Sequence, residues 1–171
     1  MNEFGLVIRP LTLEDIDAYW ALRLRAIREH PESFGASYEE EKELTMDTVR
    51  ARFPSSEDSF ALGAFERNEL VGMVGLSREK RQKLRHKAMI WGMYVSSEHQ
   101  GRGIGRRLIA AVQDRARQMD GLEKLILYVV IGNAPAQKLY RSMGFESFGI
   151  ERNALKLGDV AYDEDLMVYS L

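Results

Sequence analysis

The sequence contains no cysteine, which excludes disulfides, thiolate metal sites and a cysteine nucleophile. Histidine is also scarce. The three histidines, His30, His86 and His99, are scattered along the chain, and none lies at the spacing of metal ligands. The sequence therefore predicts no catalytic metal.

Long apolar runs and an excess of one charge are missing as well. No apolar run approaches the roughly 18 residues that span a bilayer. The formal net charge of −2 gives no general electrostatic reason to bind nucleic acid or an anionic membrane. Residues 1–5 include an acid and lack the apolar stretch of a secretory signal. We therefore expect a cytoplasmic protein that binds neither nucleic acid nor membrane.

Hydrophobic residues make up 45% and charged residues 29% of the 171 positions, which suits one domain with a real core. Apolar periodicity and turn signals predict a strand, two helices, three strands, a helix, a strand, a helix and two strands. We expect residues 1–171 to form a single domain of mixed α/β class, with helices covering the sheet. The expected strands are 6–8, 60–66, 70–77, 88–95, 125–131, 145–155 and 160–169, and the expected helices are 13–30, 45–53, 104–119 and 133–144.

Two segments carry further structural expectations. Residues 125–131 are apolar without a break, which favours a strand that is buried on both faces. Residues 32–44 are polar and acidic and contain Gly35, so we expect a loop that is helical at most in part.

The stretch YVSSEHQGRGIGRRL, residues 94–108, places three glycines between an apolar run and an apolar helical pattern. A strand, a glycine loop and a helix N-terminus together bind anions, because the free N–H groups of the first helical turn point outward and the helix dipole favours negative charge. Glycine also lets phosphate oxygens approach with no Cβ in the way. The alternative is a glycine-rich turn that only begins a helix. The residues that such a loop would present to a phosphate are Gly101, Arg102, Gly103, Gly105 and Arg106.

The spacing of the glycines separates three phosphate-binding motifs. The P-loop requires Lys-Ser or Lys-Thr after its last glycine, which is missing here. The dinucleotide motif GxGxxG fails because Arg106 or Leu108 stands where its third glycine is needed. The pattern Q/R-x-x-G-x-G/A is matched by Gln100, Gly103 and Gly105. This is the pyrophosphate loop of the GNAT superfamily of N-acetyltransferases, which the sequence resembles here.

A second stretch, LYVVIGNAPAQKLYRSMGF at residues 127–145, resembles the next segment of the same family. It holds a buried strand, an asparagine that opens a short helix, Leu-Tyr near the end of that helix, and Gly-Phe. The resemblance is specific over residues 93–145 and generic before residue 60. It implies the GNAT fold of the α/β (α+β) class, with a single mixed, mostly antiparallel sheet of about seven strands flanked by about four helices.

The family resemblance implies that acetyl-CoA donates an acetyl group to a primary amine, without a metal. It also implies that main-chain groups of residues 93–95 pair with the pantetheine arm as another strand would, and that residues 100–106 hold the pyrophosphate. Asn133 would bond the cofactor, although plain N-capping explains an asparagine there equally well. The implied cofactor-binding residues are Met93, Tyr94, Val95, Gln100, Gly101, Arg102, Gly103, Ile104, Gly105, Arg106 and Asn133.

Tyr140 is the catalytic residue that the resemblance implies, as the acid that protonates the departing CoA thiolate. A tyrosine pKa near 10 and a thiol pKa near 8.5 differ by roughly 2 kcal/mol, so the transfer is feasible. The alternative is a core aromatic, because Tyr140 shares helical spacing with Ala136 and Met143. Without a cysteine there is no acyl-cysteine intermediate, so we expect the amine to attack the thioester directly in a ternary complex.

The base is less clear in the sequence. An amine of pKa about 10.4 must lose a proton, which costs roughly 4–5 kcal/mol at pH 7. Some family members place glutamate five residues before the helix-opening asparagine, but this chain has Tyr128 there, which disfavours acetylation of ribosomal-protein N-termini. Acidic clusters are favoured as solvated surface, yet at the substrate mouth they would attract a cationic amine. The open candidates are Glu39, Glu40, Glu41, Asp163, Glu164 and water.

The function that these observations favour is N-acetylation of a small-molecule amine. The alternatives are a protein lysine or N-terminal acetyltransferase and a non-catalytic acyl-CoA-binding module. The basic run at residues 78–87 is favoured as a solvated hairpin tip over an RNA or nucleotide contact. The amine, the length of the acyl chain and a homodimer through the last strands, which is common in the family, stay open.

Overall fold

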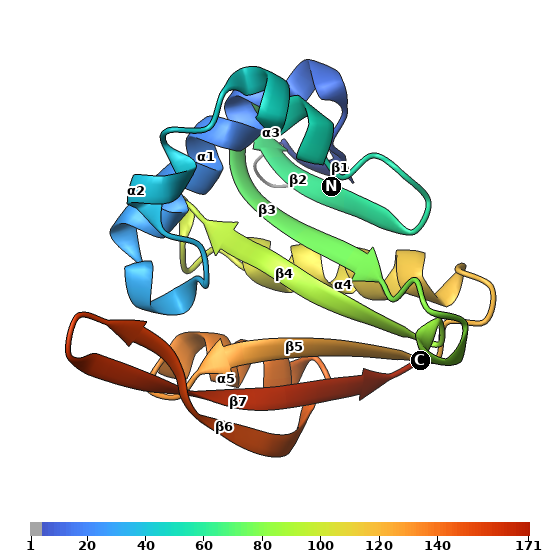
Figure 1. Cartoon of the computed structure of the whole chain (residues 1–171). Coiled ribbons are helices and arrows are strands. Elements are labelled where there is room, and N and C mark those ends of the chain that lie inside the picture. The colour runs from blue at the N-terminus through green and yellow to red at the C-terminus, as the bar shows by residue number, and fades with distance from the viewer. Residues whose placement is uncertain (1–4) are drawn as a thin grey trace.

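The computed structural model describes residues 5–171 and contains one seven-stranded sheet with helices on both faces (Figure 1). The strands are β1 (Leu6–Pro10), β2 (Ser59–Glu66), β3 (Glu69–Arg78), β4 (Lys87–Val95), β5 (Lys124–Val130), β6 (Glu146–Leu157) and β7 (Val160–Ser170). Their order in the sheet is β1-β2-β3-β4-β5-β7-β6, and within the described chain only β4 and β5 pair in parallel. The expected mixed, mostly antiparallel sheet is confirmed. The absence of a secretory signal was expected from residues 1–5, of which 1–4 lie outside the described residues.

Within residues 5–171, five α-helices flank the sheet, where about four were expected. The added one is a single turn inside residues 32–44, the segment expected to be mostly loop. Among residues 5–171, no helix has the length and apolarity that a membrane crossing requires. The α-helices are α1 (Ile16–Glu29), α2 (Tyr38–Glu41), α3 (Met46–Arg52), α4 (Ile104–Arg117) and α5 (Ala134–Ser142), and the 3₁₀ turns are η1 (Leu13–Asp15), η2 (Pro31–Ser33), η3 (Gln82–Leu84) and η4 (Ser97–His99).

Local signals explain where η1, the turn that leads into α1, begins and where α1 ends. The Asp15 carboxylate accepts a hydrogen bond from the Thr12 backbone N–H at 2.8 Å, as the spacing of these two residues predicts. The Arg9 guanidinium also donates to Asp15 at 2.8 Å, and this hydrogen bond is the main reason why the pKa of Asp15 falls to about 2. The helix ends at Glu29, two residues before Pro31, which cannot continue it.

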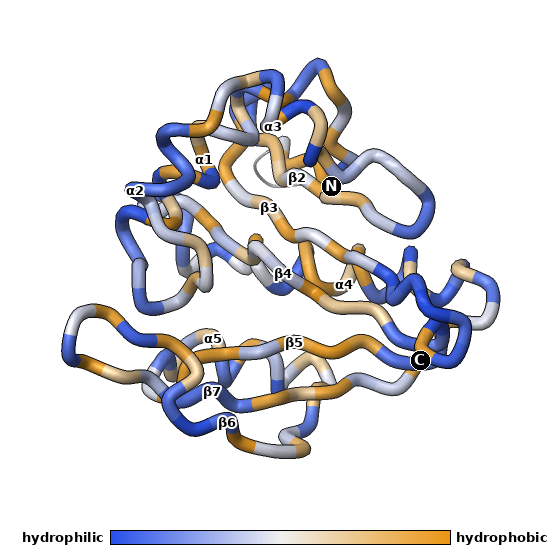
Figure 2. Tube along the Cα trace, viewed as in Figure 1, coloured by the Kyte–Doolittle hydropathy of each residue, from blue (hydrophilic) through white to orange (hydrophobic). Residues whose placement is uncertain are grey.

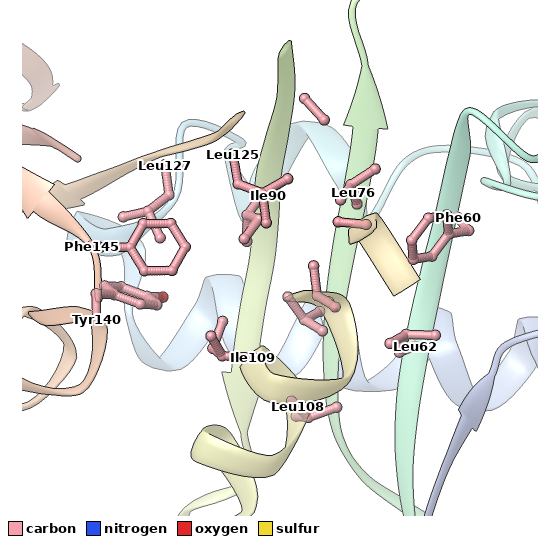
Figure 3. Packing of buried hydrophobic residues seen from close by; sticks show 14 of the residues in the cluster. Phe60, Leu62, Leu76, Ile90, Leu108, Ile109, Leu125, Leu127, Tyr140 and Phe145 are labelled. Atoms are coloured by element: carbon pink, nitrogen blue, oxygen red, sulfur yellow. The ribbon is translucent and has the colours of Figure 1, made fainter. Parts of the chain in front are cut away.

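The core consists of two apolar clusters, one on each face of the sheet. The larger cluster packs α4 and α5 against the strands, and the smaller one packs α1 and α3 against β2 and β3. Figure 3 shows Leu108 and Ile109 of α4 among side chains from the strands, with Tyr140 and Phe145 at the α5 end. The strands carry the apolar residues and the connecting loops are largely polar (Figure 2). Each face of the sheet therefore has its own covering layer of helices.

The pairing between β4 and β5 is unusually short. Lys87–Met89 pair with Lys124–Ile126, and beyond them the two strands separate. On β4, Gly92 has a φ of +65° where the register with β3 shifts, so a bulge bends this strand near the point of separation. The separated strands leave a wedge in the middle of the sheet (Figure 1).

The expectation that β5 is buried on both faces is wrong at Tyr128, although Val130 on the same face is buried. Leu125, Leu127 and Val129 are buried under α4 and α5, but the side chain of Tyr128 is 47% exposed. Side chains alternate between the faces of a strand, and on the face of Tyr128 the helices α1 and α3 cover β2 and β3 instead. The apolar sequence of the strand alone does not show that helices cover one face of β5 and leave part of the other exposed.

The close contact between Gly75 and Trp91 gives a test of packing beside the wedge. A Cβ on Gly75 would lie 2.2 Å from Cε2 of Trp91, whose indole N–H donates to Ser77 at 2.9 Å. We expect Gly75→Ala to lower the free energy of unfolding by about 1–3 kcal/mol, because the ring must move. Chemical denaturation measures this. The control is Gly35→Ala, whose Cβ would meet nothing within 4 Å. Equal stability of the two variants would contradict the contact.

Candidate functional site

A cavity of about 910 Å³ occupies the wedge where β4 and β5 separate. Its lining comes from β4 and β5, from the loop that follows β4, from the first turns of α4 and α5, and from η2. The helices α4 and α5 lie on one face of the sheet, whereas η2 follows α1 on the other face. Elements from both faces therefore meet at one cavity.

The glycine loop before α4 has a backbone that only glycine adopts easily. Gly101 and Gly103 have φ angles of +74° and +76°, in the left-handed region. Gly103 is the N-cap residue of α4 and forms no side-chain cap, so the first N–H groups of the helix find no acceptor there. Gly103, Ile104, Gly105 and Arg106 all line the cavity. The free end of a helix dipole therefore faces it.

Gly105 has a different role from the other two glycines. It lies inside α4, where a Cβ would approach Met93 Cε at 3.0 Å and Leu139 Cδ2 at 3.2 Å. A side chain at this position would separate α4 from both β4 and α5. The glycine thus permits close packing of three elements around the cavity, in addition to the approach to phosphate that the sequence predicts.

Side-chain hydrogen bonds hold the glycine loop to the end of β4. Gln100 Nε2 donates to the Val95 carbonyl at 3.0 Å, so this predicted cofactor residue turns back toward the strand. Ser96, which is buried, and His99 join through Oγ and Nδ1 at 2.8 Å. These bonds fix the path of the chain between β4 and α4.

Glu66, at the β2–β3 turn, ties down the loop from the other side. Its Oε2 lies 3.3 Å from His99 Nε2 and accepts a hydrogen bond from Arg102 Nη1 at 3.3 Å. The hydrogen bond from Arg102 lowers the pKa of Glu66 below its usual value. Arg102 is not among the described residues that line the cavity, whereas Arg106 is. Of the two arginines predicted to face a phosphate, the structure therefore places Arg106 at the cavity.

The end of β4 contributes Met93, Tyr94 and Val95 to the lining, as predicted. Met93 and Val95 pack with the α4 and α5 cluster, and Tyr94 points to the opposite face. The Tyr94 hydroxyl donates to Glu29 Oε2 at 2.5 Å. Burial, together with this bond to Glu29, raises the pKa of Tyr94 well above its ordinary value. Its side chain thereby links β4 to the end of α1.

Helix α5 brings Tyr140 to the cavity wall. The side chain is 7% exposed, and its ring packs against Phe145 with centroids 6.0 Å apart (Figure 3). No residue of the described chain hydrogen-bonds the Tyr140 hydroxyl, and no fully buried side-chain oxygen or nitrogen there lacks a partner. The hydroxyl therefore reaches the open volume of the cavity. Burial raises the pKa of Tyr140, so the hydroxyl keeps its proton at neutral pH.

Asn133 is the N-cap of α5. Its Oδ1 accepts a hydrogen bond from the Ala136 backbone N–H at 3.4 Å, so the N-capping role is present, and the residue also lines the cavity. Further along α5, Gln137 Nε2 and Arg141 Nη2 donate to the buried carboxylate of Asp165 at 3.4 and 3.3 Å. Asp165 on β7 thereby holds the helix that carries Tyr140, and no sequence pattern indicated it.

None of the acidic residues predicted as bases, Glu39, Glu40, Glu41, Asp163 and Glu164, belongs to the cavity lining. Glu164 lies next to it, because it pairs with the lining residue Val130, and burial raises the pKa of the Glu164 carboxyl. Glu41 pairs with Arg23 at 3.3 Å, and Asp163 pairs with Arg152 at 2.7 Å. Among residues 5–171, no group of three or more histidine and acidic side chains is arranged to hold a metal ion.

Two polar residues at the cavity were missed as site residues, His30 and Glu32. Both line it from the segment that follows α1, with His30 Nδ1 3.8 Å from Glu32 Oε1. In the sequence, His30 was noted only as a histidine without the spacing of a metal ligand, and Glu32 only as part of a polar loop. Their place at the site depends on η2 lying close to β5 and β6, a contact over more than ninety residues of chain that no local pattern reports.

Comparisons with known proteins agree on one family. The family model described as the acetyltransferase (GNAT) family matches residues 20–145. The chain is 33% identical over 137 residues to a mycothiol acetyltransferase of Brachybacterium faecium, which covers 79% of this chain and 39% of that relative. It is 38% identical over 91 residues to the N-alpha-acetyltransferase RimI of Mycobacterium tuberculosis, or 53% of this chain and 54% of that protein. The chain thus spans less than half the length of the mycothiol acetyltransferase.

Solved structures share the fold over nearly the whole chain. A GNAT-family acetyltransferase from Streptococcus pneumoniae superposes with a TM-score of 0.87 at 22% identity, covering 97% of this chain and 99% of that one. The Salmonella typhimurium protein yncA, solved with its cofactor acetyl-CoA, gives a TM-score of 0.82 at 19% identity, with coverage of 97% and 94%. The fold and the match over residues 20–145 lead to one conclusion: this chain belongs to the acetyltransferase (GNAT) family.

Proposed function

We propose that this protein is an N-acetyltransferase that transfers the acetyl group of acetyl-CoA to the primary amine of a small molecule. One observation carries the proposal: the free N-terminus of α4, the unpaired edge of β4 and the hydroxyl of Tyr140 share a single cavity. We further propose that residues 1–171 work as one acetyltransferase domain. The cytoplasmic location and the homodimer stay predictions.

The described residues on the α4 side fit the diphosphate of coenzyme A. The N–H groups at the start of α4 point out of the helix, and the helix dipole stabilises an anion bound there by roughly 0.3–1 kcal/mol. Several charge-assisted hydrogen bonds to one phosphate group add to this, and Arg106 supplies a positive charge beside them. The positive φ angles of Gly101 and Gly103 turn the loop without a side chain in the path.

The edge of β4 suits an extended pantetheine arm. Among the described residues this strand has no β5 partner beyond Met89, so its outward main-chain groups around Met93 face the cavity, where they could bond a ligand as they would a neighbouring strand; the Val95 carbonyl already accepts a hydrogen bond from Gln100. Acetyl-CoA bound in this way would supply the thioester. Asn133, at the start of α5, adds an amide side chain beside the same path.

Tyr140 is proposed as the acid that protonates the leaving sulfur. Burial raises the pKa of the Tyr140 hydroxyl, so the tyrosine is uncharged and has a proton to give. The same apolar surroundings disfavour the negative charge that forms on the leaving sulfur, so the proton moves from the hydroxyl to the sulfur. Since the sequence has no cysteine, the amine nitrogen attacks the thioester directly in a ternary complex.

The shape of the acceptor side supports a small molecule over a protein. A protein acceptor requires a long open groove, whereas here η2 lies close to both β5 and β6 across the wedge. The alternatives remain acetylation of protein lysines or N-termini, as the name of the RimI relative describes for that protein, and a non-catalytic acyl-CoA-binding module.

An acceptor screen tests the proposal directly. Release of free CoA thiol from acetyl-CoA is followed with a panel of small amines, with lysine-containing peptides and with free peptide N-termini. We expect small amines to accelerate thiol release well beyond hydrolysis and peptides to do so far less. Acceleration by peptides alone would favour the protein acetyltransferase. Tight binding of CoA without acceleration by any amine would favour the binding module.

The backbone of the glycine loop gives a prediction for cofactor binding. Gly103→Ala places a side chain at φ +76°, which costs about 1–2 kcal/mol and redirects the amides at the start of α4. We expect the Kd for CoA, measured by calorimetry, to rise at least 10-fold, about 1.4 kcal/mol. Gly158→Ala is the matched control, with φ +57° in the β6–β7 turn outside the cavity lining. If both variants bind CoA as the wild type does, the loop does not hold the diphosphate.

The hydroxyl of Tyr140 gives a prediction for turnover. We expect Tyr140→Phe to lower kcat about 10²–10⁴-fold, as loss of a general acid does, with little change in the Kd for CoA or in Tm. Stopped-time assays of thiol release and calorimetry measure these quantities. Tyr19→Phe is the control, because Tyr19 is also buried with a raised pKa but lies outside the cavity. An unchanged kcat in Tyr140→Phe would remove the acid role.

A further inference from the structure

The two charged ends of the cavity lie on opposite faces of the sheet. Among the described residues that line it, Glu32 is the one carboxylate, and Arg106 is the one lysine or arginine. Arg106 stands in the first turn of α4, and Glu32 lies in η2 on the α1 face. One end of the cavity therefore favours an anion and the other end favours a cation.

We infer that His30 and Glu32 form the acceptor subsite. Glu32 binds the ammonium group of the incoming substrate, and His30 takes its proton. We further infer that the substrate is an amine with an apolar body and no carboxylate next to the reacting nitrogen. The inference rests on the proposed function, since it assigns the acceptor half of the same cavity.

The position of His30 is fixed by the structure around it. Its backbone N–H donates to the Ala26 carbonyl at 2.9 Å, which closes the end of α1. Its ring lies 6.1 Å from that of Tyr94, centroid to centroid, and its Nδ1 faces Glu32 at 3.8 Å. Within the described chain neither ring nitrogen of His30 is hydrogen-bonded, so the imidazole is available to a substrate. The ionisable groups near the imidazole are Glu32 on η2, Tyr94 on β4 and Glu29 on α1.

The carboxylate of Glu32 serves both steps on the amine. It attracts the ammonium ion as the substrate enters, and it lies 3.8 Å from the imidazole of His30, which accepts the proton. The side chains of His30 and Glu32 are 43% and 38% exposed, so each is reachable from solvent and a ligand would cover both. Their exposure also lets His30 return its proton to water.

The apolar part of the substrate has a surface to cover. Tyr128 and Ile131 are 47% and 40% exposed and line the cavity together with Phe34 and Tyr162. Large apolar side chains that stay exposed at the wall of a cavity are typical of a ligand site. An aryl or alkyl group packed there would leave the amine next to His30 and Glu32, which belong to the same segment of the chain as Phe34.

The reaction balances with these groups. The ammonium proton passes to His30 and from there to water. The freed nitrogen forms a bond to the acetyl carbon, and the carbon–sulfur bond breaks. Tyr140 gives its proton to sulfur and regains one through water from the nitrogen, which sheds a second proton as the amide forms. One ammonium ion and one thioester thus yield one amide, one thiol and one proton.

Substrate selectivity follows from the charge distribution. A carboxylate on the carbon next to the amine would lie near Glu32, and the described lining on the η2 side offers no lysine or arginine to pair with it. An α-amino acid is therefore disfavoured against the matching amine or amide. The probes are tyramine, tyrosinamide and tyrosine, which share one aromatic body and differ next to the nitrogen.

The first arm of the test compares these probes. We expect the wild type to acetylate tyramine and tyrosinamide with a kcat/KM at least 10-fold above that for tyrosine, about 1.4 kcal/mol. In Glu32→Gln this preference shrinks to a few-fold, mainly because the KM for the two cationic probes rises. Glu43→Gln, which changes an exposed acid outside the cavity lining, retains the wild-type preference.

The second arm tests the proton transfer to His30. In His30→Gln we expect kcat with tyramine at pH 7 to fall about 10²–10⁴-fold. The rate with hydroxylamine, which is already unprotonated at pH 7, falls far less because it needs no base for its ammonium proton. A purely structural role would lower both rates alike. His86→Gln, outside the cavity lining, serves as the control and leaves both rates unchanged.

The outcomes separate this inference from the proposed function. If the wild type binds acetyl-CoA and acetylates other amines, but rejects tyramine and tyrosinamide or prefers tyrosine, the acceptor class is wrong. If Glu32→Gln keeps the preference, or His30→Gln slows both amines equally, the assigned roles are wrong. Only a wild type that neither binds acetyl-CoA nor acetylates any amine would overturn the proposed function as well.

Discussion

The separation of β4 from β5 after three paired residues is the constraint on which the rest of the site depends. A continuous sheet would use the main-chain groups of both strands in its own ladder and would keep its two faces apart. Because the strands part, their facing edges are free, and a cavity of about 910 Å³ has walls from both faces. Backbone groups without a ladder partner must bond to water or to a ligand. The bulge at Gly92, the close packing at Gly105 and the bonds to Asp165 each hold one wall of this opening in place.

The cavity divides its chemistry between the two faces. On the α4 and α5 face, the first amides of α4, Arg106 and Tyr140 line the part of the cavity where we propose that the acyl donor binds. On the other face, His30 and Glu32 line the part where we propose that the acceptor binds. The glycine loop is held at several points, because Ser96 and His99 are hydrogen-bonded and Glu66 contacts both His99 and Arg102. A loop fixed in this way presents its amides without having to order them when the ligand binds.

The sequence predicted the parts of the site that rest on local patterns. Spacing distinguished Gly103 and Gly105 from other glycine motifs, and the element order indicated the fold. Contacts between segments far apart in the chain could not be predicted from the sequence. The exposure of Tyr128 depends on where α1 and α3 lie, and the place of His30 and Glu32 depends on η2 reaching β5 and β6. Arg102 was read as a phosphate ligand because nothing nearby in the sequence reveals its partner, Glu66, 36 residues earlier.

The most direct measurement is a titration with coenzyme A followed by the backbone amide signals in ¹H–¹⁵N NMR spectra. If the cavity holds the cofactor as described, the amides of residues 93–95 and 103–106 shift together and saturate at one stoichiometric ligand. The amides at the β6–β7 turn, residues 157–160, stay where they are. Saturable shifts elsewhere on the molecule, with residues 103–106 unmoved, would contradict the placement of the diphosphate at the start of α4.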